Sequence, residues 1–228
     1  LLRVLVLGAV CLLLTVTTSS STIRLAINGL ACEPKPACLS GAEGSKRTET
    51  VNRLSGLTMI RSAHRLSASV SAIWLMALLV LGWGPLRSFG ARAAMITLVL
   101  LAAALAVLGV TGSPRMTSVV LGNLIGGLAM VACAGWLLGT IHTKREPSAL
   151  SMSAIVAMLV LCFAQIALGG LLSAHSASQA CAGLPLCLPI WPAQPVAWQI
   201  FNPWATPESG AEGWLAAQIL IHNLHRLL

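Results

Sequence analysis

The feature that most constrains this chain is a series of long apolar runs without charged residues. The clearest is the 18-residue stretch Ala93–Val110, which contains no Asp, Glu, Lys or Arg. About 20 such residues, wound as a helix, cross the roughly 30 Å hydrocarbon core of a bilayer. The runs are continuous and rich in Leu and Ala, which favours helices over alternating membrane strands. We therefore predict an all-α integral membrane protein, a helical bundle with spans at Leu1–Val16, Leu66–Trp83, Ala93–Val110, Thr117–Leu138 and Ala149–Leu172.

Composition excludes several other classes of protein. Of the 228 residues, 57% are hydrophobic and 9% are charged, whereas soluble domains carry roughly 25% charged residues. The 14 Lys and Arg residues are spread between the apolar runs, whereas a nucleic-acid binder gathers them on one solvated face. The chain has no Asp and only six acidic residues in total. Paired carboxylates for hydrolytic or divalent-metal chemistry are therefore scarce.

Both ends of the sequence interrupt the pattern of spans. The first run is short and contains Arg3, so a signal peptide is an alternative to a membrane span there. A sixth apolar run begins near Trp214 and continues to Leu228. Half a span would leave backbone carbonyls without partners in lipid. We therefore expect the sequence to be a fragment with about five spans and the start of a sixth.

The charges of the connections predict an orientation in the membrane. The long connection 173–213 has no Lys or Arg, which places it outside the cytoplasm by the positive-inside rule. The short connections 83–92 and 139–148 are basic and fall on the cytoplasmic side. The first long connection, 17–65, lies on the same side as 173–213, because four spans separate them. Its basic residues oppose that placement, but long loops follow the rule weakly.

The two long connections share a repeated pattern. Each contains a Cys-x5-Cys pair with proline between the cysteines, and each pair is followed by His-Arg-Leu. The first copy consists of Cys32, Cys38 and His64, and the second of Cys181, Cys187 and His225. The first cysteine recurs after 149 residues and the histidine after 161. This predicts two parallel four-helix repeats, with residues 1–140 forming the first and 141–228 beginning the second.

The cysteine pairs predict disulfides. Outside the cytoplasm thiols oxidise, which favours the pairings Cys32–Cys38 and Cys181–Cys187. One hypothesis is a redox-active or heme-delivery pair, and the other is a static staple that holds the loop. The remaining cysteines fall within predicted spans and are interpreted as packing residues; these are Cys11, Cys133 and Cys162.

The repeated histidines are the candidate site residues. An ionisable residue in a span is by default a functional hypothesis, and an imidazole that faces a bundle interior can ligate heme iron. His64 and His225 are therefore candidate axial ligands. The adjacent Arg65 and Arg226 can pair with heme propionates. The alternative is that these dipeptides only anchor helix ends in the lipid headgroups. Of the other histidines, His175 lies at the mouth of a loop and has no assigned role.

Glycines and tryptophans have structural interpretations. Gly122-x3-Gly126, followed by Gly127, and the pair Gly169–Gly170 predict close packing between helices. Three tryptophans in the second long connection predict an aromatic belt at the membrane interface, or a lid over a pocket; they are Trp191, Trp198 and Trp204.

In combination these residues resemble the heme A synthase family. In that family two four-helix halves each carry an extracytoplasmic loop with a cysteine pair, and a His-Arg dipeptide then opens the next helix. The segment Ile23–Cys32 is similar to the family's RLT-x-SGL-x-C segment, and Leu168–Cys187 is similar to its second-half partner. The resemblance covers essentially the whole chain.

The resemblance implies an oxidoreductase that converts the C8 methyl of heme O into the formyl group of heme A, for cytochrome oxidase assembly. It implies a heme b cofactor in the second half, with His225 as one axial ligand, and heme O as the substrate of the first half. The implied partners are heme O synthase, oxidase assembly factors and membrane lipid, with no nucleic acid. The implied location is the bacterial cytoplasmic membrane, with the cysteine loops outside.

Two positions depart from the family's first-half pattern. The Glu of its Glu-x-x-His-Arg signature is Arg61 here, and Asn123 stands where a second histidine ligand is expected. A neutral amide does not replace an imidazole on iron, and Arg does not act as an acid, so the catalytic residues are unassigned. Two alternatives follow: a catalytically silent heme-binding assembly paralogue, and a membrane thiol oxidoreductase that uses the loop cysteine pairs.

Overall fold

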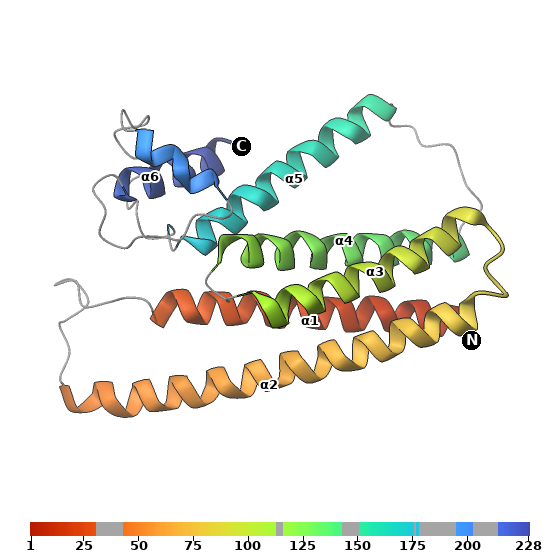
Figure 1. Ribbon diagram of the computed structural model, residues 1–228, viewed down its shortest axis with the longest axis horizontal. Coiled ribbons are helices and arrows are strands. Elements are labelled where there is room, and N and C mark those ends of the chain that lie inside the picture. The colour runs from red at the N-terminus through yellow and green to blue at the C-terminus, as the bar shows by residue number, and fades with distance from the viewer. Residues whose placement is uncertain (31–42, 113–115, 143–150, 176, 178–194, 203–213) are drawn as a thin grey trace. The chain divides into compact units, whose positions relative to one another are not determined.

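The computed structural model describes residues 1–30, 43–112, 116–142, 151–175, 177, 195–202 and 214–228. The elements in this described part are all helical (Figure 1). In chain order they are α1 (Leu2–Leu30), α2 (Glu43–Gly82), α3 (Phe89–Thr111), α4 (Thr117–His142), α5 (Met152–Ala174), the 3-10 helix η3 (Pro195–Phe201) and α6 (Trp214–Leu227).

Five helices are long and apolar enough to cross a membrane, which confirms the predicted all-α membrane architecture. These segments are Leu2–Arg24, Gly56–Gly82, Phe89–Thr111, Thr117–Ile141 and Met152–Ala174. Only 11% to 22% of the most apolar window of each segment is buried, so most of these apolar side chains are partly or fully accessible, as lipid-facing residues would be. The sixth helix, α6, has 14 residues and occupies the predicted sixth apolar run.

The first two helices extend beyond the predicted spans. Because α1 continues to Leu30 and α2 begins at Glu43, the connection predicted over 17–65 is much too long. Hydropathy detects only the apolar part of a helix. In the polar part of α1, hydroxyls bond to carbonyls one turn earlier; Thr18 Oγ1, for example, donates to Leu14 O at 2.8 Å. Such bonds satisfy the side chains locally and let the helix continue through Ser- and Thr-rich sequence.

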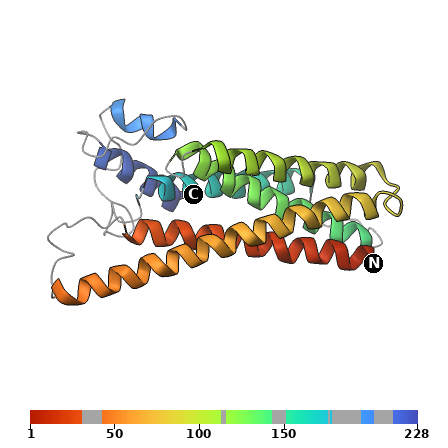
Figure 2. The same cartoon turned by 60° about the horizontal axis from the view of Figure 1, so that its bottom comes forward.

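The chain divides into two compact units. The first comprises Leu1–Ala102 and Gly127–His142, and the second comprises Ala103–Gly126 and Thr143–Leu228. Within the first unit α1 and α2, drawn red and orange, lie side by side (Figure 2). Within the second unit α6 packs against both α5 and η3.

In the first unit, Trp74 fixes the packing of α2 on α1. Its indole Nε1 donates to Leu5 O at 2.8 Å, and its ring covers Gly8. A Cβ at Gly8 would lie only 2.6 Å from Trp74 Cζ2. The two helices approach this closely because position 8 has no side chain, as expected for small residues between membrane helices.

The second unit confirms the predicted packing role of its glycines. A Cβ at Gly122 would lie 2.5 Å from Leu108 Cδ2, and one at Gly126 would lie 2.7 Å from Leu105. On α5, a Cβ at Gly170 would lie 2.7 Å from Leu121 Cδ2. Leucines of one helix thus fill the space that each glycine leaves on its neighbour.

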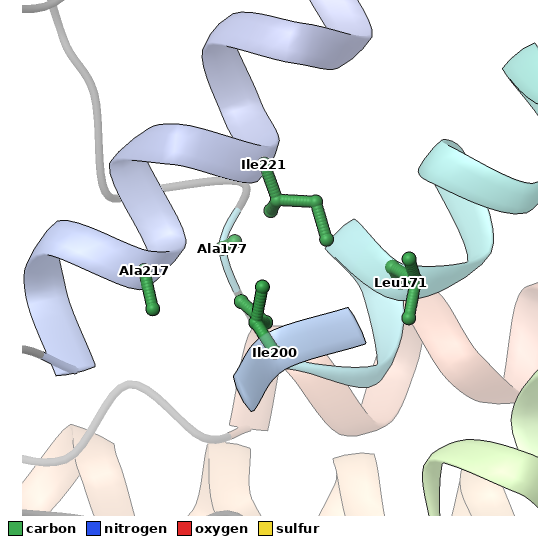
Figure 3. Close-up of a cluster of buried hydrophobic side chains, with 5 residues drawn as sticks. All are labelled: Leu171, Ala177, Ile200, Ala217 and Ile221. Carbon is green, nitrogen blue, oxygen red and sulfur yellow. The ribbon is translucent and has the colours of Figure 1, made fainter. Parts of the chain in front are cut away.

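A small apolar core joins α5, η3 and α6 in the second unit. Leu171 of α5, Ile200 of η3 and Ile221 of α6 converge there (Figure 3). Ala177 and Ala217 complete this cluster. Ile200, Ala217 and Ile221 are fully buried. Through Ala217 and Ile221 this core packs α6 against its neighbours, next to His222 in the sequence.

Candidate functional site

In the first unit, His64 lies on α2 and faces α1. Its ring is half-buried, and its Nδ1 lies 2.9 Å from the hydroxyl Oγ of Ser19. The Ser19 hydroxyl in turn donates to Val16 O at 2.9 Å. The polar stretch of α1 that continues beyond the apolar run therefore provides the partner of the first candidate histidine.

The arginines next to His64 lie in a different environment from its ring. Both Arg61 and Arg65 are exposed, so their guanidinium groups are accessible to an external anion. Arg61 precedes His64 by three residues and occupies the position where the family resemblance expects a glutamate. The structure thus places a cation, not a carboxylate, one turn before the histidine.

In the second unit, His225 lies on α6 and faces α5. A Cβ at Gly169 would lie 3.3 Å from His225 Cε1, so the imidazole occupies the space beside a residue that has no side chain. One turn earlier on α5, Gln165 Nε2 donates to His225 O at 3.2 Å. This bond fixes the end of α6 on α5.

The Nδ1 nitrogen of the His225 ring is buried and has no hydrogen-bond partner among the described residues. Buried imidazole nitrogens almost always have a partner, in protein, in water or in a bound ligand. The adjacent Arg226 is half-buried. His225 therefore combines a defined position with an unused ligating atom.

The two candidate histidines occupy matching positions within their own units. His64 contacts α1 at Ser19, which lies 13 residues before Cys32 in the sequence. His225 contacts α5 at Gly169, which lies 12 residues before Cys181. The stretch of chain from Cys32 to His64 and the stretch from Cys181 to His225 differ in length. The similar positions of the two histidines therefore result from how the helices pack, and not from equal spacing along the sequence. In each unit the histidine of His-Arg-Leu meets the preceding helix at nearly the same register.

Two further histidines, with no role predicted from the sequence, are buried in the second unit. His222 is 7% exposed and His175 is 4% exposed. His222 Nδ1 lies 2.9 Å from Ala177 O; because a carbonyl only accepts, this nitrogen donates. The available signal was the i, i+3 spacing of His222 and His225, which places both on one side of α6.

His175 connects three segments of the second unit. It caps the C-terminus of α5 through its backbone N–H to Leu171 O. Its ring Nε2 lies 3.4 Å from Thr117 Oγ1 at the start of α4, and its carbonyl accepts from Gln218 Nε2 of α6 at 2.8 Å. Burial lowers the pKa of His175, and a hydrogen bond with the backbone of Ile200 opposes this in part. His175 is therefore a structural histidine that favours its neutral form.

The remaining residues singled out in the sequence are the cysteines and Asn123. The cysteines of both predicted disulfides, Cys32–Cys38 and Cys181–Cys187, lie outside the described residues. Asn123 is half-buried on α4, in the second unit, whereas His64 belongs to the first. Of the cysteines interpreted as packing residues, Cys133 lies 3.6 Å from Ala94 O. The other two, Cys11 and Cys162, are exposed, so that interpretation is wrong for them.

Of the three loop tryptophans, only Trp198 has a described side chain. It is exposed and stacks on Phe201, with ring centroids 5.9 Å apart.

The part of the chain that the structure describes contains no group of three or more His, Cys, Asp or Glu side chains that could hold a metal ion by themselves.

Comparisons with known proteins provide no relative. No family model, no curated protein and no solved structure matches this chain.

Proposed function

We propose that this chain is a membrane heme protein of the heme A synthase type. The observation that carries the proposal is the matched position of His64 and His225. Two histidines that recur in sequence also meet the preceding helix at nearly the same register in their own units, with an offset of one residue. Anchoring of helix ends in lipid headgroups would require no such match, whereas two equivalent ligand sites would.

The residues fit a heme. His225 offers a buried Nδ1 that has no partner within the described part of the chain, and its imidazole lies beside Gly169, which has no side chain to displace it. His64 is held at Nδ1, which leaves Nε2 as a ligating atom. Each histidine is followed by a cation, Arg65 in the first unit and Arg226 in the second, and a guanidinium suits a propionate of the heme in its own unit. When bound, heme would supply an iron that exchanges single electrons.

In this proposal the second half holds heme b at His225, and the first half receives heme O at His64. The reaction would be the four-electron oxidation of the heme O methyl at C8 to the formyl of heme A, in which water would supply the oxygen atom and an external acceptor would take the four electrons. The chain's own residues would bind and orient the porphyrin. A histidine would be the ligand of the iron, and an arginine would pair with the propionates. The cysteine pairs would act as loop staples outside the cytoplasm.

A reduced-minus-oxidised visible spectrum of the purified chain tests heme binding. We expect a b-type heme signal in the wild type that decreases in both His64→Ala and His225→Ala. The matched control is His142→Ala, since His142 is the last residue of α4 and belongs to neither His-Arg-Leu sequence. A chain without heme absorbance, whose activity disappears on Cys→Ser substitution in the loops, would instead be a thiol oxidoreductase.

A second candidate is a heme-binding assembly protein without catalysis. It is favoured by the exposed Arg61 in place of a glutamate and by an amide at Asn123. The two candidates are distinguished by measuring the conversion of heme O to heme A by the wild type and by the double variant Arg61→Glu/Asn123→His. Formation of heme A by the wild type supports the synthase; formation only by the double variant supports the silent protein.

A further inference from the structure

The hydroxyl of Ser19 lies between the His64 ring and the backbone of α1. A serine hydroxyl has one hydrogen to donate. Ser19 Oγ donates to Val16 O at 2.9 Å and lies 2.9 Å from His64 Nδ1. With its hydrogen on the Val16 carbonyl, the hydroxyl must accept from the ring. The contact with Ser19 therefore requires a hydrogen on Nδ1.

We propose that Ser19 is a positioning residue that holds His64 in the Nδ1–H tautomer and so leaves the lone pair on Nε2 for a ligand. A neutral imidazole has one N–H, so fixing it on Nδ1 assigns Nε2 as the electron donor. The bond also fixes the rotation of the ring and raises the donor strength of Nε2, as outer partners do for metal-bound histidines. The ligand part of this inference rests on the proposed function, whereas the tautomer is a property of the chain alone.

The second unit lacks this arrangement. At the matching point of α5, His225 faces Gly169, which offers no hydroxyl, and its Nδ1 has no partner among the described residues. The two histidines are alike in sequence but are held differently. His64 is the histidine with a fixed tautomer, and His225 therefore serves as an internal reference for any effect of Ser19.

The tautomer can be measured by nuclear magnetic resonance of the ligand-free chain in detergent, with ¹⁵N-labelled histidine at a pH where the rings are neutral. The His64 signals are assigned by their loss in His64→Gln. We expect the Nδ1–H form in the wild type. In Ser19→Ala the population of the Nε2–H form should rise about fivefold, as for the loss of one neutral hydrogen bond. Ser19→Thr, which keeps the hydroxyl, should retain the wild-type form.

Controls and a second readout make the test decisive. Ser20→Ala removes the neighbouring hydroxyl and should leave His64 unchanged, and the His225 signals should not respond to Ser19→Ala. In a His225→Ala background, Ser19→Ala should weaken hemin binding at His64 about 10- to 100-fold, and Ser19→Thr should restore it. An Nε2–H tautomer in the wild type, or a tautomer that ignores Ser19→Ala, overturns the inference. Absence of hemin binding in every variant contradicts the proposed function, while the tautomer result still decides the role of Ser19.

Discussion

The imidazole of His225 lies directly against the backbone of α5 at Gly169, where a Cβ would stand 3.3 Å from His225 Cε1. The absence of a side chain at Gly169 is thus the local condition for the position of the histidine. The nearby bond from Gln165 Nε2 to His225 O, at 3.2 Å, holds the same end of α6. Together these contacts determine where the ring of the second candidate ligand can lie.

Substitution of Gly169 tests this relationship. In an open helix position Gly→Ala gains about 1 kcal/mol of helix propensity. At Gly169 the new methyl group would press on the His225 ring, so we expect that gain to be cancelled and heme content to fall. The measurement is thermal unfolding in detergent together with heme content per chain. Gly135→Ala is the matched control, because a Cβ at this helical glycine would meet nothing within 4 Å. Equal effects at both positions would contradict the account.

The packing of α1 on α2 is tested at Gly8. A methyl group there would lie 2.6 Å from Trp74 Cζ2, and the indole cannot retreat without losing its 2.8 Å bond to Leu5 O. We expect Gly8→Ala to destabilise the protein by about 1–3 kcal/mol, the usual cost of overpacking. Gly56→Ala on α2, where the added Cβ has open space, should be neutral or stabilising. Unchanged thermal stability of Gly8→Ala would show that the two helices do not pack here.

The lowered pKa of His175 predicts a pH-dependent stability. Above about 6.5, the ordinary histidine value, the ring is neutral in both the folded and the unfolded chain. As the pH falls below that value, the unfolded chain binds a proton first, so the folded state loses stability until the pH reaches the lower folded pKa. We expect thermal unfolding at pH 5 to begin at a lower temperature than at pH 7.5. In His175→Gln this difference should shrink; if it is unchanged, other groups cause it.

The extent of sequence prediction differs between the fold and the site. The five spans follow from hydropathy alone, because uncharged runs near 20 residues have few alternatives to a membrane helix. The ends of α1 and α2 were not predictable in this way. Ser- and Thr-rich sequence, such as that around Thr18, is typical of loops. Here its hydroxyl groups form hydrogen bonds within the helix.

At the site, the sequence identified His64 and His225 but not their partners. Ser19 and Gly169 become partners only through the register of one helix on another, which depends on side-chain packing far apart in the chain. His175 was noted in the sequence without a role. Its contacts with Thr117, Gln218 and the backbone of Ile200 join segments that no sequence spacing relates.

The most direct test of the central claim, that His64 and His225 form two equivalent ligand sites, is the number of hemes bound per chain. Purified wild type and the His64→Ala, His225→Ala and double variants would be titrated with hemin in detergent, with heme counted against protein by the pyridine hemochrome absorbance. The account predicts two hemes per chain in the wild type, one in each single variant and none in the double variant. Heme binding that is unchanged in the double variant would contradict it.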